Sequence, residues 1–500
     1  MIIIYILNFI TVLFNSIYIE KYLHIYQLRD YNFNRYLRYF LKIRGIYHVF
    51  CVISLIFSVI FKNLIFLSIV DIVFLIVSII YHRRLIGSKK TPLKHTPKIK
   101  RLYVISILLL LLTTPLYFGA TLSHMILLLL PMLSNLLNIY DKIKNKNYIK
   151  SAQLKLRLNK AKIIAITGSN GKTSVKNILY EFLRTKYKVL MTPKSFNTPL
   201  GISKFINESL IADFDYVILE YGARKIHDIS KLCKLFGADY GIITLVAPQH
   251  LSTFKNIENI YNAKSELSKY LCHDICVFNL DNIYTYRMYQ ERTNKKLGIS
   301  IFSKSDIYAS EIKIVDYNTE FFMHFKDSKI KFRTRLLGRH NVTNILLASA
   351  LAIHLGVDMS DIKKACETLP FVPHRLELIK TDINILDDSY NCSLLSAEES
   401  ISVLSSLSNK KMIVTPGIIE AGKYEYEINY KLGRLCHASD IVVIIGRQNK
   451  DAIRDGLLST GFPIQNLFYA DTLALASKYY SMLNKGDNLL LLNDLPDDYQ

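Results

Sequence analysis

The sequence is poor in cysteine and in acidic residues. Its seven cysteines are scattered and odd in number, which argues against a disulfide framework and fits a reducing compartment. The one close pair, Cys272 and Cys276, matches no common zinc module, so ordinary thiols are favoured over a metal site. Acidic residues number 41 against 63 basic ones, which gives a formal net charge of +22. A surplus of this sign is typical of proteins that bind nucleic acid or an anionic membrane surface.

The basic residues crowd into short loops between long apolar runs, which favours a membrane over a nucleic acid as the anionic partner. Half of the residues are hydrophobic, and the aliphatic runs concentrate in the first 140. A spanning helix needs about 20 mostly apolar residues. The sequence therefore predicts an all-α transmembrane domain of about five helices over residues 1–140. The candidate spans are Ile2 to Ile19, Ile46 to Phe61, Leu64 to Tyr81, Leu102 to Ala120 and Leu122 to Tyr140.

Two basic loops, after the first and third predicted spans, set the expected orientation. Because such loops stay on the cytoplasmic side, we predict a multi-pass protein of the plasma (inner) membrane with its N-terminus outside. The catalytic domains would then be cytoplasmic. The uncharged start of the chain argues against a cleaved signal peptide. Residues 141–160 are rich in lysine and asparagine and predict a solvated juxtamembrane linker.

A phosphate-binding loop is predicted directly after this linker. Residues 162–166 form a short β-branched run, residues 167–174 read Thr-Gly-Ser-Asn-Gly-Lys-Thr-Ser, and a helical pattern follows. Backbone N–H groups at the glycines face phosphate oxygens, Lys172 supplies charge at the β- and γ-phosphates, and the Thr173 hydroxyl can ligate Mg²⁺. Ile166 stands where the general pattern has glycine, so this is a shorter variant. The predicted ATP-binding residues of the loop are Gly168, Ser169, Asn170, Gly171, Lys172, Thr173 and Ser174.

Polar residues follow the next predicted strands. The strand at 216–219 leads into Glu220, and the strand at 240–246 leads into a segment that ends at His250. Ligands of open α/β sheets gather at the carboxyl ends of strands. Glu220 and His250 are therefore placed where a metal ion would bridge ATP and a second substrate. From the residues alone, a capping or loop role for each is an equal alternative.

Five motifs, taken in order, resemble those of the Mur ligase family. They are residues 167–173, 195–201, 220–223, 250–251 and 263–266. The Phe-Asn-Thr loop, the Glu-Tyr-Gly-Ala motif and a later Asp-Asp-Ser-Tyr-Asn are most similar to the branch that adds D-Ala-D-Ala to a cell-wall precursor. Each motif alone is compatible with chance, whereas the ordered set is specific.

The resemblance implies roles for individual residues. Thr173, Glu220 and His250 would be ligands of Mg²⁺. Lys264 would be carbamylated by CO₂, and its new carboxylate would help to hold a second Mg²⁺; from the residues alone it is a lysine on a predicted helix. Asn197 and Thr198 would contact the substrate. The implied catalytic residues are Lys172, Glu220, His250 and Lys264, and the implied metal ligands are Thr173, Glu220, His250 and Lys264.

Two further elements resemble nucleotide contacts of the family. Residues 337–344 match its Gly-x-His-Asn-x-x-Asn element, so Asn341 and Asn344 would lie near the adenine; a helix N-cap by Asn341 or Thr343 is compatible with that role. The His-Arg-Leu-Glu segment resembles the signature whose arginine, here Arg375, approaches the ATP phosphates. Asp388, at the end of a predicted strand, would hold the ribose.

The predicted fold class is multidomain. The transmembrane bundle and linker would precede a P-loop α/β central ATP-binding domain at 161–370, and a Pro-rich break would separate it from a Rossmann-like α/β domain at 371–500. The last domain contains no dinucleotide fingerprint. Its predicted strands are 383–386, 412–415, 441–445 and 488–492, and its predicted helices lie near 426–436, 450–458 and 472–483.

Some residues depart from the family pattern. The predicted spans occupy the place of a domain that grips the uridine nucleotide of the acceptor. The segment Asn391-Cys392-Ser393-Leu394 stands where other members have Asn-Ala-Asn-Pro, and Arg224 stands where Asn is usual. An acidic stretch at 493–498 replaces an expected basic loop. These changes leave the ATP chemistry in place and put both organic substrates in question.

The sequence thus predicts an ATP-dependent, ADP-forming amide ligase of cell-wall (peptidoglycan) precursor synthesis that uses ATP and Mg²⁺ and adds D-Ala-D-Ala to a muramoyl-tripeptide through an acyl phosphate. The expected partners are ATP, a nucleotide- or lipid-linked cell-wall precursor, a D-Ala-D-Ala-like amine and the membrane, with no nucleic acid. One alternative is a ligase of the same scaffold that acts on a lipid-linked precursor or another polymer. The other is a non-catalytic membrane scaffold with a nucleotide site.

Overall fold

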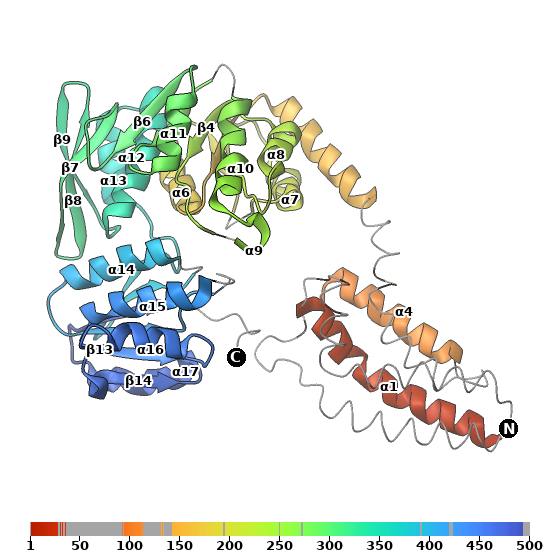
Figure 1. Cartoon of the computed structure of the whole chain (residues 1–500). Helices are drawn as coiled ribbons and strands as arrows, with labels where there is room; N and C mark the ends of the chain where they lie inside the picture. The colour runs from red at the N-terminus through yellow and green to blue at the C-terminus, as the bar shows by residue number, and fades with distance from the viewer. Residues whose placement is uncertain are drawn as a thin grey trace. The chain divides into compact units, whose positions relative to one another are not determined.

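The computed structural model divides into two compact units, Met1–Asn145 and Lys146–Gln500 (Figure 1). It describes residues 2–28, 31, 33, 36, 93, 95–113, 132, 134, 143–193, 196–249, 251–271, 274–390, 393–419 and 424–493.

The first unit contains two described helices, α1 (Ile2–Leu28) and α4 (Pro97–Thr113), which lie against each other (Figure 1). Ile19 and Leu23 of α1 and Leu102 of α4 are fully buried. Within the described ranges, none of the helices has the length and apolar character that a membrane crossing requires. The predicted multi-pass localisation is therefore wrong on this finding.

The physical reason lies in the ambiguity of apolar runs. A run that is hydrophobic on most sides suits a membrane span, but it equally suits a helix that buries its side chains against another helix. The 17 residues of α4 also fall short of the roughly 20 that a span needs. The predicted spans at 46–61 and 64–81, and most of the one at 122–140, lie outside the described residues.

Residues 143–159 form a helix, most of it in the second unit, where the sequence predicted a solvated linker. Ala152 and Leu156 of this helix are buried. Lys155 Nζ donates to the carbonyl of Asn207 at 2.5 Å, and Asn159 Nδ2 donates to that of Ala212 at 2.6 Å. This stretch is thus packed onto the domain that follows.

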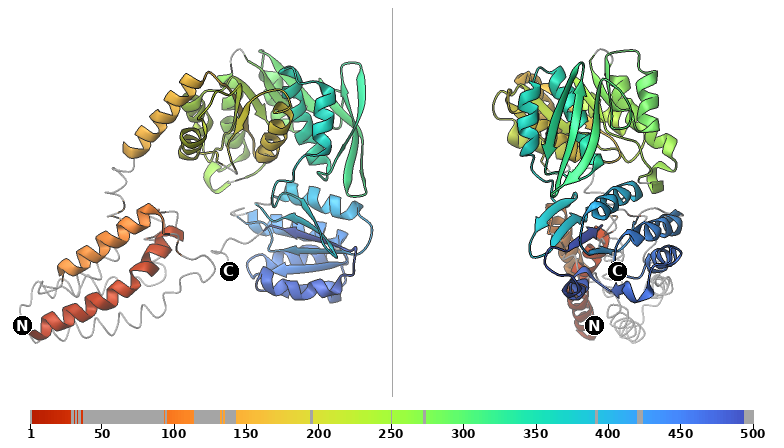
Figure 2. Two further views of the ribbon diagram at one scale, coloured as in Figure 1. Left: turned by 180° about the vertical axis from the view of Figure 1, so that it is seen from behind. Right: turned by 90° about the vertical axis from the view of Figure 1, so that its left-hand side faces the viewer.

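A nine-stranded sheet forms the middle of the chain, in the order β2-β3-β1-β4-β5-β6-β7-β8-β9. The first seven strands pair in parallel and the last two are antiparallel (Figure 2). Their bounds are β1 Lys162–Thr167, β2 Val189–Met191, β3 Tyr216–Glu220, β4 Tyr240–Ile243, β5 Cys276–Asn279, β6 Lys296–Ser300, β7 Ile307–Val315, β8 Asn318–Phe325 and β9 Ser328–Thr334.

Helices cover both faces of this sheet, and β1 shows why. Ile164 and Ile166 belong to one hydrophobic core and Ile163 and Ala165 to another, so the strand is buried on both sides, as central parallel strands are. The first core contains helices α6 Lys172–Leu183, α12 Arg339–His354 and α13 Met359–Glu367. The second contains α7 Pro199–Ser209, α8 Asp228–Phe236, α9 Leu251–Phe254, α10 Ile257–Tyr270 and α11 Ile283–Glu291.

A six-stranded sheet of order β10-β11-β15-β12-β13-β14 forms the C-terminal domain. Its strands are β10 Glu377–Lys380, β11 Asn384–Asp388, β12 Lys411–Thr415, β13 Ile441–Ile445, β14 Leu467–Ala470 and β15 Asn488–Leu492. Its helices are α14 Leu394–Ser406, α15 Glu425–Leu435, α16 Lys450–Leu458 and α17 Leu473–Ala476, with 3₁₀ turns η2 Cys436–Ala438, η3 Ile464–Asn466 and η4 Ser477–Met482.

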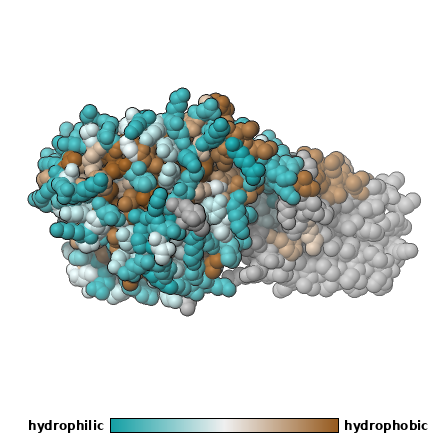
Figure 3. Space-filling model, turned by 90° about the horizontal axis from the view of Figure 1, so that it is seen from above, coloured by the Kyte–Doolittle hydropathy of each residue, from teal (hydrophilic) through white to brown (hydrophobic). Residues whose placement is uncertain are grey.

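The α/β part of the predicted fold class is confirmed by these two sheets, whereas the transmembrane bundle is not supported. The helix predicted at 472–483 is instead the short α17 followed by a 3₁₀ turn. Figure 3 shows a face on which hydrophilic side chains predominate, with hydrophobic patches between them.

Candidate functional site

The loop between β1 and α6 has the conformation that phosphate binding needs. Gly168 has φ +148° and lies so close to Thr244 Oγ1 that a Cβ there would overlap it, so glycine is required. Lys172, the first residue of α6, folds back over the loop. Its Nζ donates to the carbonyls of Gly168 and Ser169, both at 2.8 Å. The ammonium is therefore held beside the backbone amides that open the helix.

Glu220, the last residue of β3, is 1% exposed, and three polar side chains contact its carboxylate. Thr173 Oγ1 donates to Glu220 Oε2 at 2.9 Å, and Asn197 Nδ2 donates to Glu220 Oε1 at 3.0 Å. Lys176 Nζ lies 3.7 Å from Glu220 Oε2, and both side chains are almost fully buried. Burial lowers the pKa of Lys176, although the carboxylate of Glu220 opposes that shift.

Lys264 lies on α10 and is 3% exposed. Burial lowers its pKa well below the ordinary value of 10.5, and the nearby charge of Lys172 lowers it further. Glu220 and Asp228 act in the opposite direction. Burial also lowers the pKa of Lys172 itself. Two buried lysines, Lys176 and Lys264, and the part-buried Lys172 thus lie near one buried carboxylate at the carboxyl edge of the sheet.

A small cavity of about 110 Å³ opens on this cluster. Its lining includes loop, strand-end and C-terminal residues. They are Ser169, Asn170, Gly171, Lys172, Thr173, Ser174, Asn197, Glu220, Gln249, Arg375 and Tyr390. The predicted metal ligands Thr173 and Glu220 therefore lie together with the predicted substrate residue Asn197.

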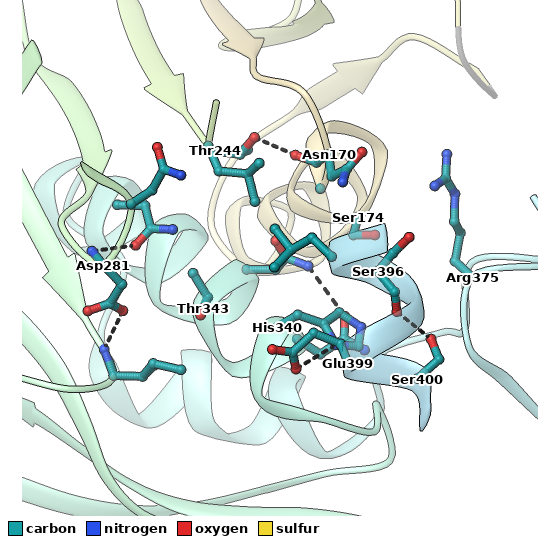
Figure 4. A pocket seen from close by; sticks show the side chains of 18 of the residues that line it. Asn170, Ser174, Thr244, Asp281, His340, Thr343, Arg375, Ser396, Glu399 and Ser400 are labelled. Carbon is teal, nitrogen blue, oxygen red and sulfur yellow. Dashed lines mark hydrogen bonds and ion pairs between the residues drawn. The ribbon is translucent and has the colours of Figure 1, made fainter. Parts of the chain in front are cut away.

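A larger cavity of about 260 Å³ adjoins the first, because Asn170, Gly171, Ser174 and Arg375 line both. In Figure 4, Asp281 and Arg375 lie on opposite sides of it, with His340 and Glu399 between them. Side chains of both sheets' domains line this cavity, including the predicted nucleotide contacts Asn341, Asn344, Arg375 and Asp388. The volume and the mixed polar and apolar lining suit a nucleoside.

Asn341 and Asn344 sit one turn apart at the start of α12. Asn341 Nδ2 donates to the carbonyl of Leu337 at 2.8 Å, and Asn344 Nδ2 contacts Asn341 Oδ1 at 3.4 Å. The helix begins at Arg339 after Gly338, with no side-chain cap. The N-cap role predicted for Asn341 or Thr343 is therefore wrong, because the helix starts before both residues.

Arg375 and Asp388 enter the site from the C-terminal domain. Asp388 Oδ1 accepts from the Leu376 N–H at 3.2 Å, and Asp388 Oδ2 accepts from Ser400 Oγ at 2.6 Å. Burial raises the pKa of Asp388, although its hydrogen bond from Ser400 opposes this. The residue before Arg375 is also fixed, since His374 Nδ1 lies 2.8 Å from Asp387 Oδ2.

Other predicted site residues lie outside the cavities. Thr198 is the N-cap of α7, and its Oγ1 accepts from the Gly201 N–H at 3.2 Å. Gly168 contributes its carbonyl to Lys172 and lines neither cavity. Lys264 is buried beside the small cavity's charges without lining it. His250 lies outside the described residues.

Several residues of the site were not predicted from the sequence. Lys176 follows Lys172 by four positions, so the helical spacing alone places both on one face of α6 and was an available signal. Glu399, by contrast, comes from α14 and reaches the cavity only through the packing of the two domains. No local sequence pattern predicts that such a residue belongs to the site.

The arrangement can bind a nucleoside triphosphate and neutralise its charge. A glycine loop with Lys172 faces the phosphates, and an oxygen donor set of Thr173 and Glu220 suits Mg²⁺. The adjoining cavity accommodates the base and ribose. The described residues contain one group of three His or acidic side chains close enough to share a metal ion, namely His374, Glu377 and Asp387, and it includes none of the predicted ligands.

Comparison with known proteins identifies related chains. Residues 166–352 match the family described as the Mur ligase middle domain. The chain is 30% identical over 297 residues to the UDP-N-acetylmuramoyl-tripeptide–D-alanyl-D-alanine ligase of Buchnera aphidicola subsp. Baizongia pistaciae, covering 58% of this chain and 64% of that relative. It is 28% identical over 296 residues to the enzyme of the same name from Escherichia coli K12, covering 58% and 65%. The chain thus spans a little under two thirds of the length of these curated relatives.

Solved structures resemble this chain over most of its length. MurF ligase from Thermotoga maritima, in complex with ADP, has a TM-score of 0.63 at 25% identity, covering 70% of this chain and 80% of that one. A crystal structure of MurF from Acinetobacter baumannii has a TM-score of 0.63 at 24% identity, covering 70% and 77%.

Proposed function

We propose that this chain, which carries the Mur ligase middle domain at residues 166–352, is an ATP-dependent ligase that joins D-Ala-D-Ala to the tripeptide carboxylate of a UDP-N-acetylmuramoyl acceptor. The observation that carries the proposal is the buried carboxylate of Glu220. Thr173 and Asn197 both donate to it, Lys172 lines the same small cavity, and the larger cavity adjoins that one. The relatives' own activity, named for the same acceptor and dipeptide, supports this choice of substrates.

In the proposed reaction the acceptor carboxylate attacks the γ-phosphorus of ATP, and ADP leaves. The amine of D-Ala-D-Ala then attacks the acyl carbon, inorganic phosphate leaves, and the amine loses a proton. The fixed positive charge of Lys172 balances charge on the transferring phosphoryl group. Arg375, which lines both cavities, reaches the nucleotide from the C-terminal domain. Closing that domain over the site keeps water from the acyl phosphate.

Mg²⁺ would be held by Thr173 and Glu220, with His250 as a further proposed ligand. The donor set fits, since a buried carboxylate and a hydroxyl within 2.9 Å of each other present the oxygen atoms that this ion prefers. When bound, Mg²⁺ neutralises phosphate charge. Asn197 keeps the second oxygen of Glu220 oriented in the same cavity.

Lys264 is proposed to carry a carbamate. Its buried amine has a strongly lowered pKa, so a larger share of it is uncharged than for an exposed lysine and can attack the carbon of CO₂. The product is an N-carboxylated lysine, and one proton is released. The new negative charge would lie near the Lys172 ammonium and offset its positive charge.

The test is phosphate release by the full-length chain supplied with ATP, Mg²⁺, bicarbonate, D-Ala-D-Ala and the UDP-N-acetylmuramoyl-tripeptide. We expect release that depends on both organic substrates. Lys172→Ala is expected to lower the rate by about 10²–10³-fold. Lys231→Ala, which removes an exposed lysine of α8, is the matched control and should leave the rate unchanged. Tight ATP binding without dipeptide-dependent release would contradict the proposed substrates.

Carbamylation has its own readout. Chain equilibrated with ¹³C-labelled bicarbonate should show a carbamate carbon resonance that disappears in Lys264→Ala and persists in Lys231→Ala. Removing bicarbonate should lower the ligase rate of the unmodified chain, and Lys264→Ala should lose about 10–100-fold in rate whatever the bicarbonate concentration. An unlabelled Lys264 in an active enzyme would refute this part of the proposal.

A further inference from the structure

The wall of the larger cavity formed by α14 carries a carboxylate that the proposed ligase reaction does not yet use. Glu399 and Ser400 lie one turn after Ser396 on this helix, and all three line the cavity. The helix begins next to the phosphate loop, because Asn170 Nδ2 donates to Ser393 Oγ at 2.9 Å. From Ser393 to Glu399 the helix rises about 9 Å. Glu399 is therefore separated from the phosphate loop by about this distance, which places it beside the part of a bound nucleotide that follows the phosphates.

Glu399 is oriented by a partner from the other domain. Its Oε2 lies 3.7 Å from His340 Nδ1, and both side chains are 33% exposed within the cavity. The approach of the His340 side chain holds the pKa of Glu399 below its ordinary range, against a burial that would raise it. His340 is its one ion-pair partner among the described residues. The carboxylate is thus charged, held in place and open to a ligand.

Two neighbouring groups are partly engaged. Asp388, which also lines the cavity, accepts one hydrogen bond on each oxygen, from the Leu376 N–H and from Ser400 Oγ, and each oxygen keeps a further lone pair. Ser396 Oγ accepts from the Ser393 N–H at 2.8 Å as part of a capping box. A carboxylate whose lone pairs face the cavity accepts hydrogen bonds and donates none. Its natural ligand groups are therefore hydroxyls or amines of the nucleoside.

We propose that Glu399 binds one ribose hydroxyl of the nucleotide, beside the ribose contact predicted for Asp388, and so contributes to specificity at the sugar. In Figure 4, Glu399 and His340 lie between Asp281 and Arg375, which line opposite sides of the cavity. Arg375 also lines the phosphate cavity, so its side is the phosphate side and the Asp281 side is left for the base. The sugar connects the two and passes Glu399. This inference rests on the proposed use of ATP.

The experiment measures dissociation constants of Mg²⁺ complexes of ATP, 2′-deoxy-ATP and 3′-deoxy-ATP for the full-length chain by titration calorimetry. The unmodified chain should bind ATP about tenfold or more tightly than at least one deoxynucleotide, as expected for a hydrogen bond to a charged group. Glu399→Ala should bind ATP and that deoxynucleotide equally. Glu398→Ala, an exposed neighbour on α14 that lines neither cavity, is the matched control and should keep the preference.

The outcomes separate this inference from the proposed function. Equal binding of the three nucleotides by the unmodified chain would overturn the role of Glu399 and leave the ligase proposal standing. A Glu399→Ala variant that weakens all three by the same factor would show that Glu399 acts only through His340 between the domains. Failure of the unmodified chain to bind any of them would overturn the ATP chemistry and this inference together.

Discussion

Two buried lysines of the site differ in what balances their charge. Lys176 lies 3.7 Å from the carboxylate of Glu220, whereas Lys264 makes no ion pair within the described residues and lies near the charge of Lys172. Burying a charge costs free energy that only a close partner offsets. Removing the two side chains should therefore have opposite effects on stability.

Lys264→Met should stabilise the chain when bicarbonate is absent. Folding lowers the pKa of Lys264 below 10.5, so the folded chain binds fewer protons than the unfolded chain between the lowered value and 10.5. Stability from this group thus rises with pH across that window and falls as pH decreases. The variant should lose this slope and melt higher near neutral pH, by roughly 2–4 °C for each kcal/mol gained. Calorimetric melting at several pH values measures both. A lower melting temperature in Lys264→Met would contradict the argument.

Lys176→Met should have the opposite effect. It leaves the Glu220 carboxylate, which is 1% exposed, without the cation nearest to it. Breaking a buried pair in this way costs about 3–5 kcal/mol. Urea unfolding of Lys176→Met beside Lys264→Met provides the measurement, since both variants replace a buried lysine by the same side chain. Equal midpoints for the two would show that Glu220 does not need Lys176.

At the scale of elements, α15 and α16 pack with their backbones unusually close. A Cβ on Gly456 would overlap the Tyr430 carbonyl, and a Cβ on Gly433 would overlap the Ile453 carbonyl, so the contact is reciprocal. Backbone atoms cannot rotate away as a side chain does. Gly456→Ala should force the helices apart and destabilise the C-terminal domain by about 1–3 kcal/mol, despite the better helix propensity of alanine.

Urea unfolding followed by circular dichroism tests this contact. Arg434→Ala, at an exposed position of α15, is the comparison and should change the midpoint little. A Gly456→Ala variant as stable as the unmodified chain would mean that the helices separate at no cost.

Elements with strong local patterns were predictable, and those set by pairing were not. The run at 441–445, fully buried and β-branched, is the strand β13 within the predicted bounds, and the phosphate loop follows β1 as predicted. The strands β7, β8 and β9 were missed. They continue the sheet beyond β6, with β7 parallel to β6 and with β8 and β9 antiparallel to their neighbours, and this pairing does not follow from any one segment's pattern. The apolar runs of α1 and α4 were assigned to a membrane, because hydropathy alone does not say what covers a helix.

The residues of the site likewise differ in whether the sequence could predict them. Glu220 ends β3, and Thr173 lies in the first turn of the helix α6 that follows the neighbouring strand β1, so their meeting follows from the rule that parallel strands align their carboxyl ends. Glu399 and His340 come from different domains, and no spacing in the sequence brings them together. A sequence pattern predicts site residues when a single element or a single sheet brings them together. It does not predict site residues that come together only because two domains pack against each other.

At the scale of the whole second unit, the two domains also meet away from the cavities. Tyr317, in the turn between β7 and β8, donates to Asn488 Oδ1 at 2.9 Å and accepts from Asn384 Nδ2 at 2.7 Å. Ile314 and Tyr317 pack against the hydrophobic core of the C-terminal domain. Together with the contact of Asn170 and Ser393, this gives the C-terminal domain two separate attachments to the first sheet's domain.

Tyr317→Phe should loosen one attachment and leave the other. The variant keeps the ring packing and loses two hydrogen bonds, each contributing about 0.5–1.5 kcal/mol. Opening of the C-terminal domain should then be about tenfold more frequent, and hydrogen exchange should accelerate in the connecting segment 369–376 while the phosphate loop exchanges as before. Mass spectrometry of exchange measures this, with Tyr308→Phe, on the strand β7 that leads into this turn, as the comparison. Because nucleotide contacts both domains in the proposed complex, saturating ATP should restore slow exchange in Tyr317→Phe. Acceleration confined to the β7–β8 turn itself would show that this attachment does not hold the domains together.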